Sequence, residues 1–472
     1  MGLIIPGVEI RVIRELVPRP LGATGVLGIV GPTEVDRSSK PLQALGSLQE
    51  FRETYGPASV MSLPEVRQAF AAGLNQVVVV NIPPDLMTAA AVEESVQVNG
   101  SPAKLEFRAK AGGAWGNDLS VRLVTRTGVA AGQEAVEVQV FRKGTDQPVE
   151  TIRNLSSRRD HARYFVAAVS AESSFVRATL KTAAAPDAQV LPDNTNPDAL
   201  PKPLTGGQDA MPEAFAAALA RLETFPDVDM VAASHRYGEA NATQICAEII
   251  SHCERMSRIA RNRMGFGQTI PTEDGRPNME VTTRMASRLV SERFVLVAPH
   301  GYMGAVIGMI AGQRYFESPT FKSLPGVSSL SFDFTDPQLE ALIKAGVCAV
   351  DEVPRKGISV VKGITTDTGQ INVTRVADRA VRHVQNIAQD FIGLLNTEAH
   401  RLALKQRITE AFTRMEREGA IVPSTDGQSP AFAVSVESTP DDFAAGVVRI
   451  DTAVRPVRAI DYIYATIKVQ AF

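Results

Sequence analysis

Hydrophobic and polar positions alternate at both ends of this chain of 472 residues. A period of two predicts strands that bury one face. The buried faces would carry Val8, Ile10 and Val12 near the N-terminus, and Ile463, Ile467 and Val469 near the C-terminus. Since chain ends usually fray, each predicted strand needs a sheet to join. Two interpretations stay open: edge strands of the same subunit, or strands donated to a neighbouring subunit, which would build a polymer.

Short apolar runs alternate with helical patterns in the body of the chain. β-branched runs of this length suit strands buried on both faces, and their alternation with helices predicts an open, mostly parallel sheet. The predicted strands are residues 25–30, 77–82, 228–233 and 294–298, and the predicted helices are residues 47–55, 64–72 and 242–261.

Residues 91 to about 206 have a different character, which predicts an inserted β-rich domain. Alternating segments separated by Asn-Gly and Gly-Gly turn signals predict strands over residues 95–98, 104–110, 119–125, 135–142 and 175–180. One helix is expected over residues 159–170. Residues 183–203, rich in Pro, Asp, Asn and Ala, are expected to form an exposed linker back to the core.

Two amphipathic helices are predicted before the C-terminal arm, over residues 378–395 and 398–418. The first places Val381, Val384, Ile387, Phe391 and Leu395 at helical spacing. Neither helix is apolar all round, so both are expected at a surface or an interface. Gly419 is well placed to end the second helix.

Composition narrows the class of protein. The length suggests about two to four domains, and 44% apolar with 21% charged residues is typical of a globular protein. A net charge of −3 and a pI near 6.2 argue against a nucleic-acid partner. Three cysteines without a CxxC motif favour folding in a reducing compartment. No apolar run reaches membrane-spanning length and no signal peptide is recognisable, so we expect a soluble protein.

We find no convincing catalytic, cofactor or metal site in the sequence. The glycines of residues 22–31 interrupt a strand instead of following it, unlike a dinucleotide loop. His235 could serve as a base, but no GxSxG motif accompanies it. Cys246 and Cys253, with His252 between them, do not have the spacing of a zinc site and fit buried hydrophobic positions better.

Several ordered segments resemble the tail sheath proteins of contractile bacteriophage tails and related contractile injection systems. They include Ile5-Pro-Gly-Val-Glu-Ile, Thr24-Gly-Val-Leu-Gly-Ile-Val-Gly, Ala111-Gly-Gly-Ala-Trp-Gly-Asn-Asp-Leu-Ser-Val, Gly357-Ile-Ser-Val-Val-Lys-Gly-Ile-Thr-Thr and Asn372-Val-Thr-Arg-Val-Ala-Asp. The resemblance runs over nearly the whole chain in the family's order, although residues 315–324 follow the pattern only loosely.

The resemblance implies an α/β core with a subtilisin-like sheath fold and no protease activity, an inserted β-rich domain, and strand-like arms at both termini. The implied division is residues 1–20, 21–90, 91–205, 206–448 and 449–472, as N-terminal arm, core, insert, core and C-terminal arm. Hinges would lie over residues 14–21, with Pro18 and Pro20, and over residues 449–458, with Pro456.

The implied partners are further copies of the chain, an inner tail tube protein, and baseplate and tail terminator proteins, with no nucleic acid and no membrane. The particle would be a phage tail or injection device assembled in the bacterial host cytoplasm. The arms would enter the sheets of neighbouring subunits while the sheath shortens and drives the tube through a target envelope.

Basic residues on the second C-terminal helix suggest a contact with an acidic inner tube, although a solvated helix face explains them equally well. They are Arg401, Lys405, Arg407, Arg414 and Arg417. Three classes of function therefore stay open: a contractile sheath, a static virion component, and a hydrolase with a triad near His235.

Overall fold

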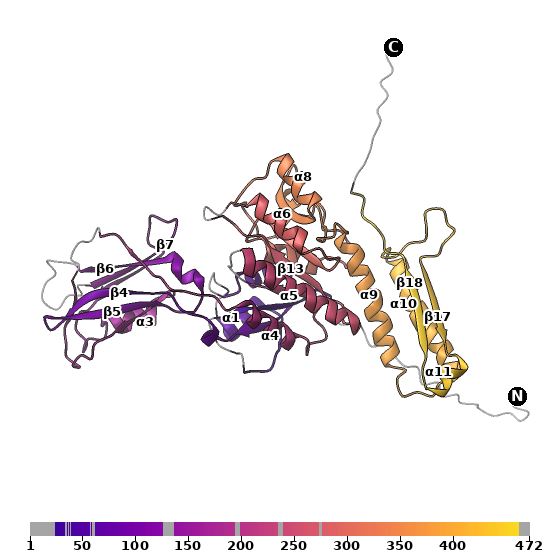
Figure 1. Cartoon of the computed structure of the whole chain (residues 1–472), viewed down its shortest axis with the longest axis horizontal. Coiled ribbons are helices and arrows are strands. Elements are labelled where there is room, and N and C mark those ends of the chain that lie inside the picture. The colour runs from indigo at the N-terminus through magenta and orange to yellow at the C-terminus, as the bar shows by residue number, and fades with distance from the viewer. Residues whose placement is uncertain are drawn as a thin grey trace, which may run out of the picture.

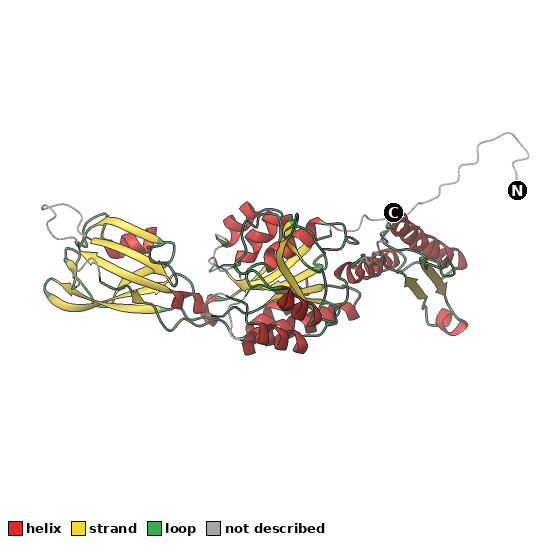
Figure 2. Ribbon diagram, turned by 90° about the horizontal axis from the view of Figure 1, so that it is seen from above, coloured by secondary structure: helices red, strands yellow, loops and turns green. Residues whose placement is uncertain are grey.

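The structure is a computed structural model that describes residues 24–33, 35, 37, 39–56, 58, 62–125, 136–193, 199–234, 239–272 and 276–461. The predicted arm strands lie outside the described residues, and so do Pro18, Pro20 and His235. The described chain forms an elongated molecule of three bodies in a row, with the insert at one end, the core in the middle and a C-terminal layer at the other end (Figures 1 and 2).

The core is an eight-stranded sheet with the order β16-β15-β14-β13-β12-β1-β3-β2. The six central strands are parallel, as predicted, and the edge strands β16 and β2 are antiparallel. Their bounds are β1 Val26–Pro32, β2 Ala44–Leu45, β3 Gln76–Ile82, β12 Met230–Ala233, β13 Met264–Gln268, β14 Phe294–Ala298, β15 Val347–Val353 and β16 Gly357–Val360. Both faces of the central strands are buried, which explains their continuous apolar runs.

Helices cover both faces of the core sheet. One face packs against α1 (Leu48–Tyr55), α2 (Pro64–Ala72) and α7 (Met303–Gly312). The other packs against α4 (Pro212–Leu222), α5 (Glu239–Arg258), α6 (Met279–Arg288) and α8 (Asp336–Lys344). The predictions of α1, α2 and α5 are confirmed to within a few residues, whereas α4, α6, α7 and α8 were not predicted.

Strand β13 was not predicted because its sequence, Met-Gly-Phe-Gly-Gln, contains two glycines, which are unusual inside strands. Packing against α5 and β14 explains them. A Cβ on Gly265 would lie 2.6 Å from Ile249 Cγ2, and one on Gly267 would lie 2.7 Å from Phe294 Cζ and 2.8 Å from Cys246 Sγ. Glycine lets the neighbouring side chains approach the strand directly.

The insert consists of two four-stranded sheets and helix α3 (Phe165–Glu172), with the strand orders β10-β4-β5-β9 and β11-β6-β7-β8. The strand bounds are β4 Ala91–Val98, β5 Ser101–Ala109, β6 Leu119–Thr125, β7 Val136–Arg142, β8 Glu150–Leu155, β9 Val176–Leu180, β10 Val190–Pro192 and β11 Lys202–Pro203. The apolar inner faces of the two sheets and α3 form a separate core around Phe107, Val138 and Phe165.

Two predictions for the insert were wrong in detail. Helix α3 begins six residues later than predicted, because the segment before it is tied to the strand β10 region, where Arg159 N donates to Ala188 O at 3.0 Å. The expected linker also contributes β10 and β11 to the two sheets, and Val190 is fully buried. Burial of a few apolar residues outweighs the Pro- and Asp-rich composition of this segment.

The C-terminal layer contains α9 (Ile371–Gln389), α10 (Glu398–Arg417), the hairpin of β17 (Phe432–Glu437) and β18 (Arg449–Val454), and the short helix α11 (Pro440–Ala444). This layer has its own apolar cluster, centred on Val376, Ile408, Phe412 and Met415. The sequence interpretation had placed residues 206–448 in one core, but Figure 1 separates this layer from the core sheet.

Helix α9 differs from its prediction at both ends. It begins seven residues earlier than expected and ends at Gln389, and Gly393 then adopts a φ of +87°, which directs the chain out of the helix. Leu395, predicted on the buried face of this helix, is therefore 76% exposed. Helix α10 confirms its prediction, with Gly419 at a φ of +78° just after its end.

Candidate functional site: the C-terminal layer and the two chain exits

The C-terminal exit, residues 455–461, is hydrogen-bonded to the body. The predicted hinge over residues 449–458 was wrong at its start, because Arg449–Val454 forms strand β18. Pro456 forms a bridge with Ile421 and is flanked by two backbone hydrogen bonds, from Val422 N to Arg455 O and from Val457 N to Ala420 O, both at 3.0 Å.

Gln370, which precedes α9, holds the last part of this exit. Its Oε1 accepts from Ala459 N at 3.0 Å, and its Nε2 donates to Ala459 O at 3.1 Å and to Asp461 Oδ2 at 2.9 Å. Asn372 Nδ2 donates to Val457 O at 3.1 Å, and Lys362 lies 3.7 Å from Asp461. The start of α9 thus holds the last described residues of the chain, 457–461.

The N-terminal exit, residues 24–26, is also hydrogen-bonded to the body. Asp229 accepts from Gly25 N at 2.9 Å and from Val26 N at 2.8 Å. Thr24 and Asp229 line a small hollow together with Arg375, Arg379 and Arg382 of α9. Burial lowers the pKa of Arg375, and the nearby charge of Asp229 opposes this shift. Helix α9 therefore borders both exits.

A buried ion pair joins α9 to the core. Arg293 Nη1 lies 2.7 Å from Asp378 Oδ1, and Asn262 Nδ2 donates to the same oxygen at 2.8 Å. Burial raises the pKa of Asp378, whereas Arg293 opposes that shift. Arg382 Nη2 donates to Val228 O and Asn262 O, both at 2.8 Å. These contacts fix α9 on the carbonyl groups that precede β12 and β13.

These functional residues were missed in the sequence, although one signal was present. The segment Asn372-Val-Thr-Arg-Val-Ala-Asp carries Asn372, Arg375 and Asp378, and we used it only as a family-like motif. Nothing in the local pattern indicates the partners Asp229, Arg293 and Val457, which lie between 85 and 146 positions away along the chain.

The β17–β18 hairpin is a two-stranded sheet among the described residues, so each strand has an edge that no described strand covers. Its inner face packs toward α10 through alternating apolar residues, which are Phe432, Val434, Val436, Ile450 and Val454. A two-stranded sheet is marginally stable alone, and uncovered edges are where a further strand can add.

The five basic residues predicted on α10 differ in their burial and in their partners. Arg407 is largely buried, lies 3.3 Å from Asp390 and covers the ring of Phe391. Arg401 donates to Asn396 Oδ1 at 2.7 Å, and Arg414 pairs with Glu410 at 3.9 Å. Lys405, Arg414 and Arg417 lie together on an exposed face of α10 with Leu402 and Thr409.

A cavity of about 220 Å³ lies at the carboxyl ends of the core strands, between the core and the insert. Ligands of open α/β sheets bind at this edge, where the strand order reverses. Here Gln268 Nε2 donates to Glu65 at 3.2 Å and His300 Nδ1 donates to Thr269 O at 2.8 Å. Trp115 and Asp209 of the insert side complete the wall, and Asp209 accepts from Ala114 N at 2.8 Å. The wall of the cavity is thus built from residues of both bodies.

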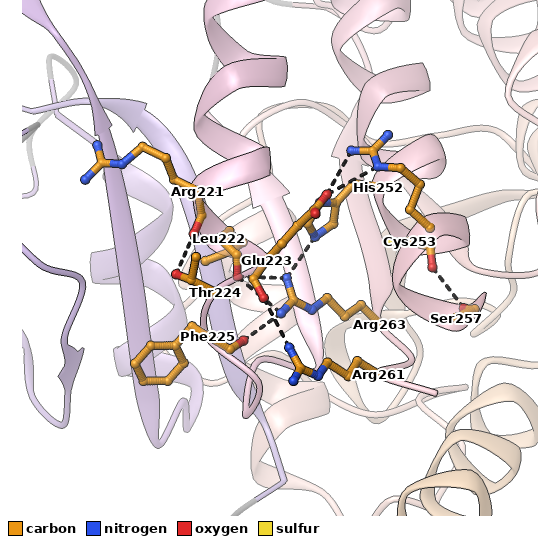
Figure 3. A network of polar contacts seen from close by, with 11 residues as sticks. Arg221, Leu222, Glu223, Thr224, Phe225, His252, Cys253, Ser257, Arg261 and Arg263 are labelled. Carbon is orange, nitrogen blue, oxygen red and sulfur yellow. Dashed lines mark hydrogen bonds and ion pairs between the residues drawn. The ribbon is translucent and has the colours of Figure 1, made fainter. Parts of the chain in front are cut away.

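His252 and Arg263 belong to a buried network at the end of α4 (Figure 3). Arg263 donates to His252 Nε2 at 2.8 Å, to Leu222 O at 3.2 Å and to Phe225 O at 2.6 Å. It thereby satisfies carbonyl groups that a helix end leaves without partners. Burial, together with the charges of Arg263 and Arg255, lowers the pKa of His252 to about 3. The neutral imidazole accepts a hydrogen bond here, which indicates a structural role.

Cys246, Cys253 and Cys348 are buried, and burial raises each thiol pKa to about 12. Within the described ranges, no cluster of three or more His, Cys, Asp or Glu side chains could hold a metal ion. The helices of the described part are all too short or too polar to cross a membrane.

Tail sheath proteins are similar to this chain in sequence over a short stretch and in fold over nearly its whole length. No protein-family model matches the chain. A stretch of 175 residues, 32% of the chain, is 29% identical to the tail sheath protein of Bacillus phage SP01 and spans 30% of that protein's length.

Solved structures align over almost the whole chain. The sheath tail protein of Desulfitobacterium hafniense aligns over 96% of this chain and 97% of its own, with a TM-score of 0.51 and 16% identity. The helical sheath of the anti-feeding prophage in its contracted state aligns over 99% of both chains, with a TM-score of 0.55 and 13% identity. The contracted sheath of the extracellular contractile injection system PVC aligns over 99% of this chain and 98% of its own, with a TM-score of 0.58 and 10% identity.

The mixed α/β fold is therefore the fold of tail sheath structures. The resemblance found in the sequence motifs is confirmed, because both the curated relative and the structural neighbours are tail sheath proteins of phages and contractile injection systems. The chain spans about a third of the length of the curated relative that it matches.

Proposed function

We propose that this protein is the structural subunit of a contractile tail sheath, which polymerises around an inner tube and contracts to drive the tube through a target cell envelope. The fold shared with contracted sheaths supports this function. It is a non-enzymatic role, and we further propose that the core keeps a subtilisin-like topology without protease activity, since fold does not imply function.

The observation that carries the proposal is the two-stranded sheet β17–β18, which packs on α10 and has edges that no described strand covers. Both arms have the period-2 pattern of strands, and an uncovered edge supplies the backbone groups that a donated strand needs. In this arrangement Val8, Ile10, Val12, Ile463, Ile467 and Val469 are the arm residues that a neighbouring copy buries. The proposed hinge around Pro18 and Pro20 would absorb the rotation of the bodies.

Contraction needs no nucleotide if the extended sheath assembles in a metastable state. The free energy then comes from subunit interfaces that exist only in the contracted lattice, at about 25 cal/mol per Å² of newly buried apolar area. Interfaces that are exchanged suit exposed charge pairs, because each contributes only about 0–1 kcal/mol.

The partners of this proposal are other copies of the chain, a tube protein, and baseplate and terminator proteins. A solved baseplate of the anti-feeding prophage contains a chain of this fold, with a TM-score of 0.56 over 100% of both chains, which favours a place near a baseplate as well. The particle would be a phage tail or a related injection device, assembled in the host cytoplasm.

Electron microscopy of the purified protein tests this function. We expect helical cylinders from the full chain and their loss from chains that lack residues 1–14 or residues 461–472. The folded bodies should survive both truncations, as measured by circular dichroism. Monodisperse monomers from all three chains would contradict self-assembly through the arms.

Two other functions make different predictions. A static virion component would form cylinders whose dimensions never change, so the contracted form would be absent from every preparation. A hydrolase would lose activity in a His235→Ala variant. We favour the sheath because the similar structures include sheaths in the contracted state.

A further inference from the structure

Exposed large apolar side chains gather where the α9–α10 turn meets α11. We define the apolar tip as the residues Ile392, Leu394, Leu395, Leu402, Phe443 and Val447. Ile392 is 79%, Leu395 76% and Phe443 59% exposed. The two parts of the tip are joined by Asn396, whose Nδ2 donates to Ser438 Oγ at 3.1 Å and to Val447 O at 3.5 Å. A gathering of this kind marks an interaction surface more often than an ordinary solvated one.

The tip lies at the turn end of the β17–β18 hairpin, since α11 and Val447 belong to the connection between these strands (Figure 1). A groove of about 450 Å³ runs from the tip between α10 and the end of β17. Its walls are Glu398, Arg401, Leu402 and Lys405 on the helix side and Val436, Glu437, Ser438 and Thr439 on the hairpin side. Leu402 belongs to both the groove and the tip, so the two form one continuous surface.

The N-terminal arm contains two kinds of apolar pattern. Val8, Ile10 and Val12 alternate with polar residues, whereas Leu3, Ile4 and Ile5 are consecutive. Pro6-Gly7 separates the two parts, and this pair interrupts strand pairing and favours a turn. A strand buries only every second side chain, so strand addition leaves residues 3–5 without an explanation.

We propose that residues Leu3–Ile5 of a neighbouring copy bind the apolar tip. This inference rests on the arm exchange of the proposed function. It adds the direction in which the N-terminal arm of the neighbour runs along the hairpin. Val8–Val12 of the neighbour would add along the uncovered edge of β17 and run antiparallel to it, which brings the start of the arm to the tip. Ile5 and Val8 are three residues apart, a reach of about 10 Å, so the surface that binds residues 3–5 must adjoin the end of the strand.

Continuity of the groove with the tip favours this occupant. The tip is apolar, and Leu3-Ile4-Ile5 is a short apolar segment that carries no charged side chain. Burial of these three side chains on the tip would remove apolar surface of both partners from water, which favours association. In this arrangement residues 8–12 of the neighbour form hydrogen bonds with the edge of β17. Residues 3–5, bound at the tip, then fix the register of that added strand.

Disulfide cross-linking in assembled cylinders tests the proposal. The full chain with Ile4→Cys and Phe443→Cys should give covalent multimers on mild oxidation, because the two positions would meet between neighbouring copies. The matched control carries Ile4→Cys and Gln428→Cys, since Gln428 is exposed in the loop that precedes β17, at the other end of the hairpin. The three native cysteines are buried and should not react.

We expect a several-fold higher yield of multimers from the Phe443 pair than from the Gln428 pair. A higher yield from the Gln428 pair would overturn the proposed direction. Intact cylinders with no cross-link in either pair would overturn the docking of residues 3–5 while leaving the sheath function standing. Loss of cylinders from the unmodified full chain would instead contradict the proposed function.

A second pair of cysteine substitutions shows whether the result depends on a local effect of the Phe443 substitution. Ile4→Cys with Leu395→Cys should behave like the Phe443 pair, since Leu395 lies on the same tip. Replacing Leu3, Ile4 and Ile5 by Ser should reduce the temperature at which cylinders dissociate, whereas replacing the neighbouring Gly2 by Ser should not. Equal dissociation temperatures for the two variants would also overturn the proposal.

Discussion

Gln370 and Ala459 pair through both hydrogen-bonding groups of the Gln370 side-chain amide, at 3.0 and 3.1 Å. The residue before α9 thus holds the backbone of the C-terminal exit as another strand would. Because α9 also borders the N-terminal exit, the same helix contacts the chain at both exits.

We expect a Gln370→Ala variant to loosen residues 457–461 without unfolding the protein. The variant loses the three hydrogen bonds of the Gln370 side chain, each worth about 0.5–1.5 kcal/mol, which should lower the protection of the Ala459 amide against hydrogen exchange by about tenfold or more. Gln389→Ala, an exposed substitution at the other end of α9, is the control and should leave this amide unchanged. Equal protection in both variants would contradict the anchoring role of Gln370.

The Arg293–Asp378 pair should be important for docking α9 on the core. Asp378→Ala leaves the Arg293 charge and the Asn262 amide without their partner, so we expect a loss of about 3–5 kcal/mol in the free energy of unfolding. A double variant, Arg293→Met with Asp378→Leu, should recover much of that loss. Glu340→Ala breaks the exposed pair with Lys344 and should change stability by less than about 1 kcal/mol in the same denaturant titration.

Acid should weaken the network around His252 over a defined range. The pKa of this side chain is about 3 in the folded protein, because of burial and then of the Arg263 and Arg255 charges, against about 6.5 when unfolded. Below pH 6.5 the unfolded chain therefore binds a proton that the folded chain does not, so stability falls from pH 6.5 down to about pH 3.

A His252→Gln variant, which keeps a hydrogen-bond acceptor but does not titrate, should show a smaller loss across this range in urea titrations at several pH values. The exposed His161→Gln is the matched control and should keep the slope of the natural protein. A slope that is the same in all three proteins would exclude His252 as a source of the acid sensitivity.

The exposed basic face of α10 is the place to test a contact with the tube. Arg407 is engaged with Asp390 and Phe391, so reversing its charge should destabilise the fold as well as any interface. Lys405→Glu with Arg417→Glu should leave the unfolding temperature nearly unchanged and prevent the sheath from assembling on its tube. Normal assembly of this variant would mean that the face is only solvated.

The sequence determined the local elements where a single physical pattern dominates. Buried runs such as residues 77–82 have to be strands of a parallel sheet, and the apolar stripe of α10 specifies a helix that ends before Gly419. The ordered motifs also indicated the family. These signals are local, because each depends on neighbours within one element.

Only the tertiary structure decided how distant polar groups meet. Asp229 reaches residues 25 and 26, Arg293 reaches Asp378, and Gln370 reaches Ala459, in each case across a large separation in the chain. It also turned β13, with its two glycines, into a central strand, and left Leu395 exposed where helical spacing predicted burial. The physical reason is that burial and hydrogen-bond satisfaction are properties of the packed chain, and they override local preference when a neighbour from elsewhere in the sequence supplies the contact.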